Sequence, residues 1–227
     1  MFVFKRRFKG LGREVSGLQF CNPVGLYRPQ GELRIRPLAG TGVGFLTLNP
    51  DQENMLEWIR RLSEARSGRE FLFAVNLQKD VVRSFSLVYD FADFIIIDLD
   101  SNEGIGSSDL SDIPMVLDEL LNLRLCYEYY TPVFLRLPAV LDPEEMQTVL
   151  SYSMLCGING IVAEGLGTVH SVLEKTRGRI PLVGTALSEE DAQAMLQEGV
   201  SLVELKTRPP VALKLLKTLE KEAKRHD

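Results

Sequence analysis

Eight short apolar runs recur along the chain at nearly even spacing, with stretches long enough for a helix between most of them. They occupy residues 20–26, 43–48, 71–76, 94–99, 133–137, 160–163, 181–184 and 202–205. Eight strands alternating with helices are typical of a (β/α)₈ barrel. With 227 residues the chain has the length of one barrel and no room for a second full domain, so we predict a single domain over residues 1–227.

The stretches between the runs show helical spacing and helix-start signals. Met55, Ile59 and Leu62 share one helical face. N-cap oxygens followed by acidic residues predict helices after Asp51, Asp142 and Ser188, and Gly199 suits a C-cap. A final helix is expected over residues 210–224, and residues 15–19 predict a small hairpin that plugs the bottom of the barrel.

Composition narrows the class of protein. A hydrophobic share of 45% supplies a large core, while a net charge of −5 argues against nucleic-acid binding. The basic run at residues 5–9 is best explained as a solvated terminus. No apolar stretch is long enough to span a membrane, and no secretory signal is recognisable. Cys21, Cys126 and Cys156 form no metal or disulfide pattern, so we expect a cytoplasmic protein with free thiols.

Candidate functional residues lie where the predicted strands end, because the active sites of such barrels form at that edge. Asp98, Asp100, Arg136 and Glu164 are the candidate catalytic residues, since carboxylates beside a guanidinium can do acid–base work. The same residues could equally form a structural charge network. Both interpretations stay open at this point.

Metal and histidine chemistry are less favoured. Asp98, Asp100 and Glu103 offer oxygen ligands at a spacing that suits Mg²⁺, but this pattern is common, and we expect no metal site. His170 lies early in a predicted helix and His226 in the C-terminal tail, so neither stands out as a general base.

Several segments resemble the dihydroorotate dehydrogenase family, flavin-dependent barrels of pyrimidine biosynthesis. Residues 15–26, which read VSGLQFCNPVGL, resemble the opening of that family. Further matches follow in the family's order at residues 73–77, 92–98, 132–137, 156–163 and 180–191. The resemblance implies FMN as cofactor, a small molecule at the C-terminal rim and a homo-oligomer. It also implies the cofactor-binding residues, which are Asn22, Asn76, Arg136, Gly184 and Thr185.

The chain departs from the family pattern where the flavin and the substrate would bind. Bulky Tyr27 and Arg28 replace a glycine-rich run that leads to a Lys, and Arg136 replaces a flavin-contacting Lys. The loop that supplies substrate-holding Asn and Gly residues is missing after Asn49. Asp98 and Asp100 stand where neutral groups would meet an anionic orotate.

Both glycine-rich phosphate loops are also eroded, at residues 164–167 and 183–187. We therefore predict that the FMN and orotate sites are degenerate and that the barrel is non-catalytic or altered in function. The alternative is an active FMN-dependent oxidoreductase that acts on dihydroorotate or a related small substrate.

Overall fold

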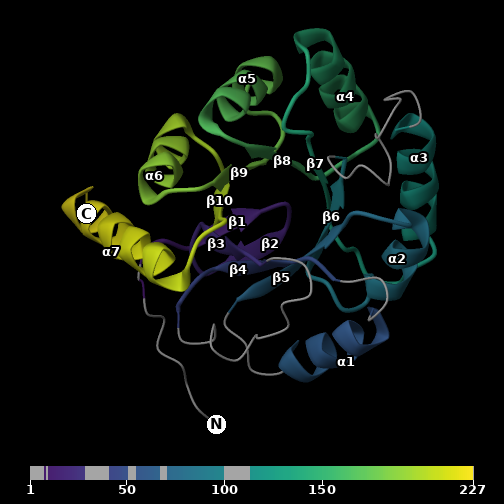
Figure 1. Ribbon diagram of the computed structural model, residues 1–227, viewed down its shortest axis with the longest axis horizontal. Helices are drawn as coiled ribbons and strands as arrows, with labels where there is room; N and C mark the ends of the chain where they lie inside the picture. The colour runs from purple at the N-terminus through teal and green to yellow at the C-terminus, as the bar shows by residue number, and fades with distance from the viewer. Residues whose placement is uncertain are drawn as a thin grey trace.

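The computed structural model describes residues 8, 10–28, 41–50, 55–66, 71–99 and 113–226. Within them, parallel strands close into an eight-stranded barrel in chain order, with β10 pairing back onto β3 (Figure 1). The barrel strands are β3 (Val24–Tyr27), β4 (Phe45–Leu48), β5 (Leu72–Leu77), β6 (Phe94–Asp98), β7 (Val133–Arg136), β8 (Gly160–Glu164), β9 (Leu182–Ala186) and β10 (Leu202–Leu205). Each lies within or overlaps one of the eight apolar runs, which confirms the predicted fold class.

Helices surround the barrel as an outer layer (Figure 1). They are α1 (Met55–Arg66), α2 (Val81–Val88), α3 (Ile113–Arg124), α4 (Pro143–Leu155), α5 (Leu166–Thr176), α6 (Glu189–Glu198) and α7 (Pro209–His226). Their apolar faces and the outward side chains of the strands form one large buried cluster, in which Trp58, Tyr89 and Phe73 are among the bulkiest members. This layer holds the strands in place, so the strand ends form a rigid platform.

The first apolar run divides into two elements. Its start, Phe20, ends an antiparallel hairpin of β1 (Arg13–Val15) and β2 (Leu18–Phe20), while its later part forms β3. The hairpin turns at Ser16 and Gly17, both at positive φ, as a tight two-residue hairpin turn requires. The predicted strand 20–26 is therefore wrong at its start, because the chain leaves the hairpin and passes Pro23 before it enters the barrel.

The hairpin closes the N-terminal end of the barrel. Phe20 packs edge-on against Phe45 and Phe94, and the Phe94 ring contacts Phe134. Together with small aliphatic side chains, these rings form a separate apolar cluster inside the barrel. The lower interior is thus filled by aromatic rings, and only the upper, C-terminal part of the barrel is left for polar side chains.

The predicted helix signals are found where the structure describes them. Asp142 caps α4 in a reciprocal capping box with Glu145, Ser188 accepts a hydrogen bond from the Asp191 backbone, and Gly199 ends α6 at positive φ. Asp51 lies outside the described residues.

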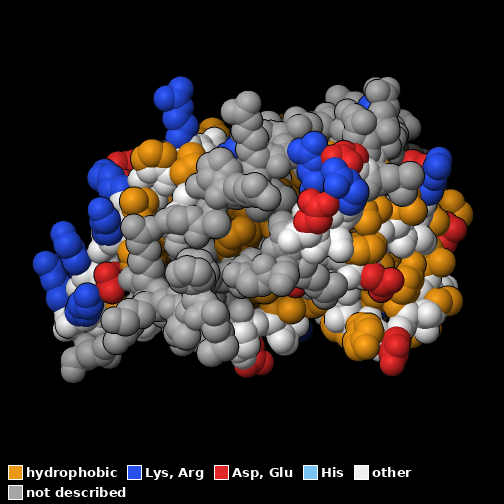
Figure 2. Space-filling model, turned by 90° about the horizontal axis from the view of Figure 1, so that it is seen from below, with side chains coloured by type: hydrophobic (Ala, Val, Ile, Leu, Met, Phe, Trp, Pro, Cys, Tyr) orange, Lys and Arg blue, Asp and Glu red, His pale blue; other side chains and the backbone are white. Residues whose placement is uncertain are grey.

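Lys and Arg side chains gather on the side of the molecule where α7 lies (Figure 2). In the part of the chain that is described, no helix is long and apolar enough to cross a membrane.

Candidate functional site

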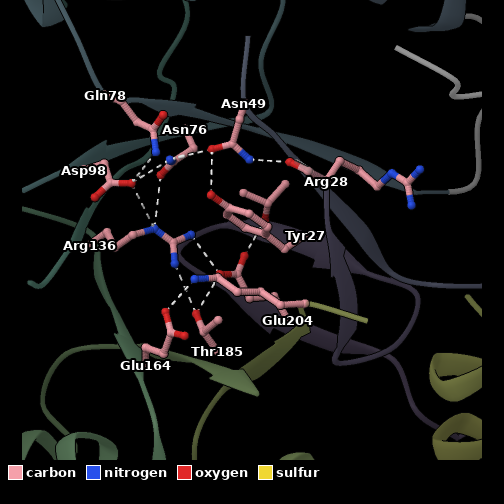
Figure 3. Close-up of polar contacts among 12 residues, drawn as sticks. Tyr27, Arg28, Asn49, Asn76, Gln78, Asp98, Arg136, Glu164, Thr185 and Glu204 are labelled. Carbon is pink, nitrogen blue, oxygen red and sulfur yellow. Dashed lines mark hydrogen bonds and ion pairs between the residues drawn. The ribbon is translucent and has the colours of Figure 1, made fainter. Parts of the chain in front are cut away.

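A polar layer fills the C-terminal end of the barrel interior (Figure 3). Side chains alternate between the two faces of a strand, so the register of each strand decides which residues point inward. Register pairs Asp98 with Arg136 on β6 and β7, and Thr185 with Glu204 on β9 and β10. Strands β4 to β7, together with β9 and β10, therefore contribute polar side chains to this layer of the barrel.

At the centre of this layer is an ion pair between Arg136 and Glu204. Nη2 of Arg136 lies 2.8 Å from Oε1 of Glu204, and the two side chains are 7% and 0% exposed. Thr47 donates to Oε2 and Thr185 donates to Oε1 of the same carboxylate, each at 2.6 Å. Two hydroxyl donors and one guanidinium, from three other strands, therefore hold the Glu204 carboxylate.

The other side of the Arg136 guanidinium faces Asn76 and Asp98. Nε of Arg136 donates to Oδ1 of Asn76 at 3.2 Å and lies 3.6 Å from Oδ2 of Asp98. The Asn76 amide donates to that Asp98 oxygen at 2.8 Å, and Gln78 reaches it at 3.2 Å. Two carboxylates thus compensate one buried guanidinium.

Tyr27 covers this network from the β3 side. Its ring lies against two cations, with 5.2 Å from the ring centroid to Cζ of Arg136 and 4.9 Å to Nζ of Lys206. Its hydroxyl donates to Oδ1 of Asn49, which also accepts from the Asn76 amide. The phenol ring occupies space directly beside the guanidinium.

A second ion pair lies nearer to solvent, where Nζ of Lys206 is 2.5 Å from Oε2 of Glu164. The two side chains are 29% and 33% exposed, so solvent screens this pair more than the buried one. Lys206 directly follows β10 and Glu164 ends β8, and β9 lies between these two strands. The arrangement places a screened pair above a fully buried one.

The electrostatics of the layer keep its central pair ionised. Burial opposes the charge on Arg136, but Glu204 and Asp98 outweigh it and raise the pKa of Arg136. Burial also opposes the charge on Glu204, yet Arg136 and the hydroxyls of Thr185 and Thr47 lower the pKa of Glu204. Burial raises the pKa of Tyr27 to about 12, against the opposing influence of Arg136. The phenol is therefore neutral at physiological pH.

The structure brings together most of the residues that the sequence singled out, and it separates two of them. Asp98, Arg136, Asn76 and Thr185 share the polar layer, and Glu164 lies above it in the pair with Lys206. Asp100 and Glu103 lie outside the described residues. Among the residues that are described, no three His, Cys, Asp or Glu side chains gather as metal ligands would.

Asn22 and Gly184 do not face the polar layer. Asn22 precedes β3, at the opposite end of the barrel, where its side chain bonds the Gly42 carbonyl and the Val24 amide. Gly184 faces outward, because a Cβ there would lie 2.6 Å from the sulfur of Met195 on α6. Its missing side chain thus serves helix packing.

Sequence reasoning missed Glu204, Thr47, Tyr27 and Asn49 as members of the site. Glu204 had a detectable signal, because it is a charged residue inside the apolar run 202–205. The residues of a short apolar run are expected to be buried, and a buried carboxylate needs a cation or hydrogen-bond donors beside it. Thr47 carried no comparable signal, since threonine is common in strands.

Comparison with known proteins agrees with this architecture. No established family model matches the chain. Dihydroorotate dehydrogenases (quinone) from three strains of Coxiella burnetii are 26% identical over 281 aligned positions, covering 89% of this chain and 81% of the relative.

Solved structures show the same fold. Dihydroorotate dehydrogenase from Eimeria tenella, in complex with ferulenol, superposes with a TM-score of 0.75 at 15% identity, over 92% of this chain and 82% of that one. An aldolase, QR15, superposes with a TM-score of 0.65 at 14% identity, over 86% of this chain and 94% of that one. The chain is thus a (β/α)₈ barrel that is similar in sequence to dihydroorotate dehydrogenases.

Proposed function

We propose that this barrel descends from the flavin enzymes of pyrimidine biosynthesis and has lost both FMN and the oxidation of dihydroorotate. It then acts as a non-catalytic barrel or in an altered function. The observation that carries the proposal is the buried Arg136–Glu204 pair, in which the guanidinium at the position of the flavin-contacting Lys is already compensated.

The charge of Arg136 is engaged inside the protein. A cation that faces the flavin ring tunes the electronics of the ring, and for this it must be free to point toward the ligand. Arg136 instead contacts Glu204, Asp98, Asn76 and Thr185, all of which are buried. To face a ligand it would have to leave two carboxylates uncompensated, which is costly in a buried site.

Tyr27 opposes flavin binding by its volume. The family resemblance places a run of small residues after the first strand, so that the flavin ring can approach the backbone. Here the Tyr27 ring fills the space beside Arg136 and is held by its hydrogen bond to Asn49. A ring bound at this place would have to displace the phenol and break that bond.

The N-terminus of α6 also fits an anionic phosphate poorly. The resemblance assigns the flavin phosphate to this strand and helix. Ser188 already caps the helix, and the first turn carries Glu189, Glu190 and Asp191. These acids satisfy the positive end of the helix dipole and repel a second anion. FMN therefore does not fit the residues present, and we derive no step through it.

The alternative function is that of an FMN-dependent oxidoreductase acting on dihydroorotate or a related small molecule. The similarity to the Coxiella burnetii dihydroorotate dehydrogenases favours it, because the alignment covers 81% of their length. Asn76 and Thr185 also stand at the rim positions that the resemblance assigns to cofactor binding.

The visible absorbance of the protein as purified, followed by titration with FMN, separates these two functions. We expect no flavin absorbance, and no saturable quenching of FMN fluorescence by protein whose cooperative thermal unfolding shows that it is folded. Dihydroorotate and orotate, each added with FMN, should leave the melting temperature unchanged, because only a ligand that binds the folded state raises it. Stoichiometric flavin or saturable stabilisation would establish the alternative.

Location and partners are proposals too. We place the protein in the cytoplasm, because the cysteines at positions 21, 126 and 156 form no disulfide bond in the described structure. A small molecule at the C-terminal rim and a homo-oligomer are the partners that the family resemblance suggests. Size-exclusion chromatography with light scattering tests the latter, and a monomer at all concentrations would contradict it.

A further inference from the structure

Glu204 occupies a site with the features of a carboxylate-binding pocket. Its two oxygens receive hydrogen bonds from Thr47 and Thr185 and an ion pair from Arg136. All four side chains are at least nine-tenths buried, and each comes from a different strand. We infer that Arg136, Thr47 and Thr185 form a binding site for a small carboxylate, and that Glu204 fills it as a ligand covalently attached to the chain.

The geometry supports a carboxylate in particular. One oxygen accepts from the Thr47 hydroxyl. The other accepts from the Thr185 hydroxyl beside the guanidinium of Arg136 (Figure 3). Thr185 is oriented for this, because its oxygen accepts from Nη1 of Arg136 while its proton goes to Glu204. A neutral amide would place an N–H donor against a hydroxyl or guanidinium that is itself a donor, so one hydrogen bond would be lost.

The site is also closed in by its neighbours. Tyr27 lies against the guanidinium, and Asn76 and Asp98 occupy its remaining edge. The pocket can therefore exist only where the Glu204 side chain now lies. This inference is independent of the proposed loss of flavin, since every contact that it uses is made by the chain itself.

Truncation of Glu204 tests the inference. Glu204→Ala removes one methylene and the carboxylate, which together have the heavy atoms of acetate. We expect the variant to melt well below the wild type. Acetate should raise its melting temperature saturably, by about 3–6 °C at ten times the apparent dissociation constant. Acetamide, which has the same shape without the charge, should give no comparable rise.

Three variants serve as controls at equal ionic strength. Glu164→Ala removes a carboxylate from the half-exposed pair with Lys206, where water replaces it, so acetate should not stabilise it specifically. The double variant Arg136→Met, Glu204→Ala keeps the space but lacks the guanidinium, and it should lose the response to acetate. Glu204→Gln fills the pocket and should not respond either.

Several outcomes would overturn the inference. They are equal stabilisation by acetamide and acetate, an undiminished acetate response in the double variant, and no acetate response in Glu204→Ala. If Glu204→Ala does not fold alone, it is refolded from urea in either compound and its far-UV circular dichroism is recorded. Recovery in acetate only would support the inference, and equal recovery or none would contradict it.

Discussion

At the residue scale, Arg136 carries the largest predicted effect on stability. Arg136→Met would leave Glu204 and Asp98 as buried carboxylates without their cation. Loss of one partner from a buried ion pair costs about 3–5 kcal/mol, so the urea midpoint should fall strongly. Lys206→Met is the matched control, because its partly exposed pair with Glu164 contributes about 0–1 kcal/mol. Similar losses in both variants would refute the assigned difference between the two pairs.

The composition of the site could be predicted only in part from the sequence, for a reason that Glu204 and Gly184 illustrate. Polar residues at the ends of apolar runs are visible in a sequence, and Asp98, Arg136 and Thr185 were found in this way. Whether a residue points inward depends on the strand register, and a shift of one position reverses it. Gly184, which the family resemblance assigns to cofactor binding, faces α6, and Glu204 lies unrecognised inside its apolar run.

At the element scale, two glycines should respond to the same substitution with opposite signs. A Cβ on Gly160 of β8 would lie 2.4 Å from the Phe134 ring, whereas one on Gly167 in α5 would meet nothing within 4 Å. Gly160→Ala should therefore cost about 1–3 kcal/mol by overpacking the barrel interior. Gly167→Ala should be neutral or gain up to about 1 kcal/mol from helix propensity.

Urea unfolding of the two glycine variants measures this difference. A Gly160→Ala protein as stable as the wild type would show that the Phe134 ring can move aside. The variant Gly160→Ala, Phe134→Leu should recover part of the loss, because the smaller side chain vacates the space that the new methyl group needs.

The strands and helices themselves were largely predictable, and the exception has a physical cause. The helical spacing of apolar residues and the N-cap residues predicted the helices after Asp142 and Ser188, and the apolar runs predicted the barrel strands. The first run, residues 20–26, was assigned wholly to the barrel because Phe20 is as apolar as Val24, although Phe20 ends the hairpin and Val24 begins a barrel strand. Apolar character alone does not distinguish a plug from a barrel strand.

At the scale of the whole molecule, the barrel interior changes character along its axis. Aromatic rings fill the end closed by the hairpin, and charged side chains fill the other end. Replacement of a buried ion pair by hydrophobic side chains of similar volume often leaves a protein at least as stable as before. The proposed descent of the rim from a binding site therefore explains the polar layer better than a demand for stability does.

The pH dependence of global unfolding tests whether Glu204 is ionised in the folded protein. Its pKa is lowered in the native state, so its contribution to stability is present above the ordinary value of about 4.3 and is lost as the pH falls toward the lower native pKa. Glu204→Gln lacks this titration and keeps all other carboxylates. The wild type should exceed the variant in free energy of unfolding by a margin that is constant from pH 7 to about 5 and shrinks at lower pH. Urea unfolding of both proteins along this pH series measures the margin, and a margin that grows or stays constant as the pH falls would mean that Glu204 is not a charged partner of Arg136.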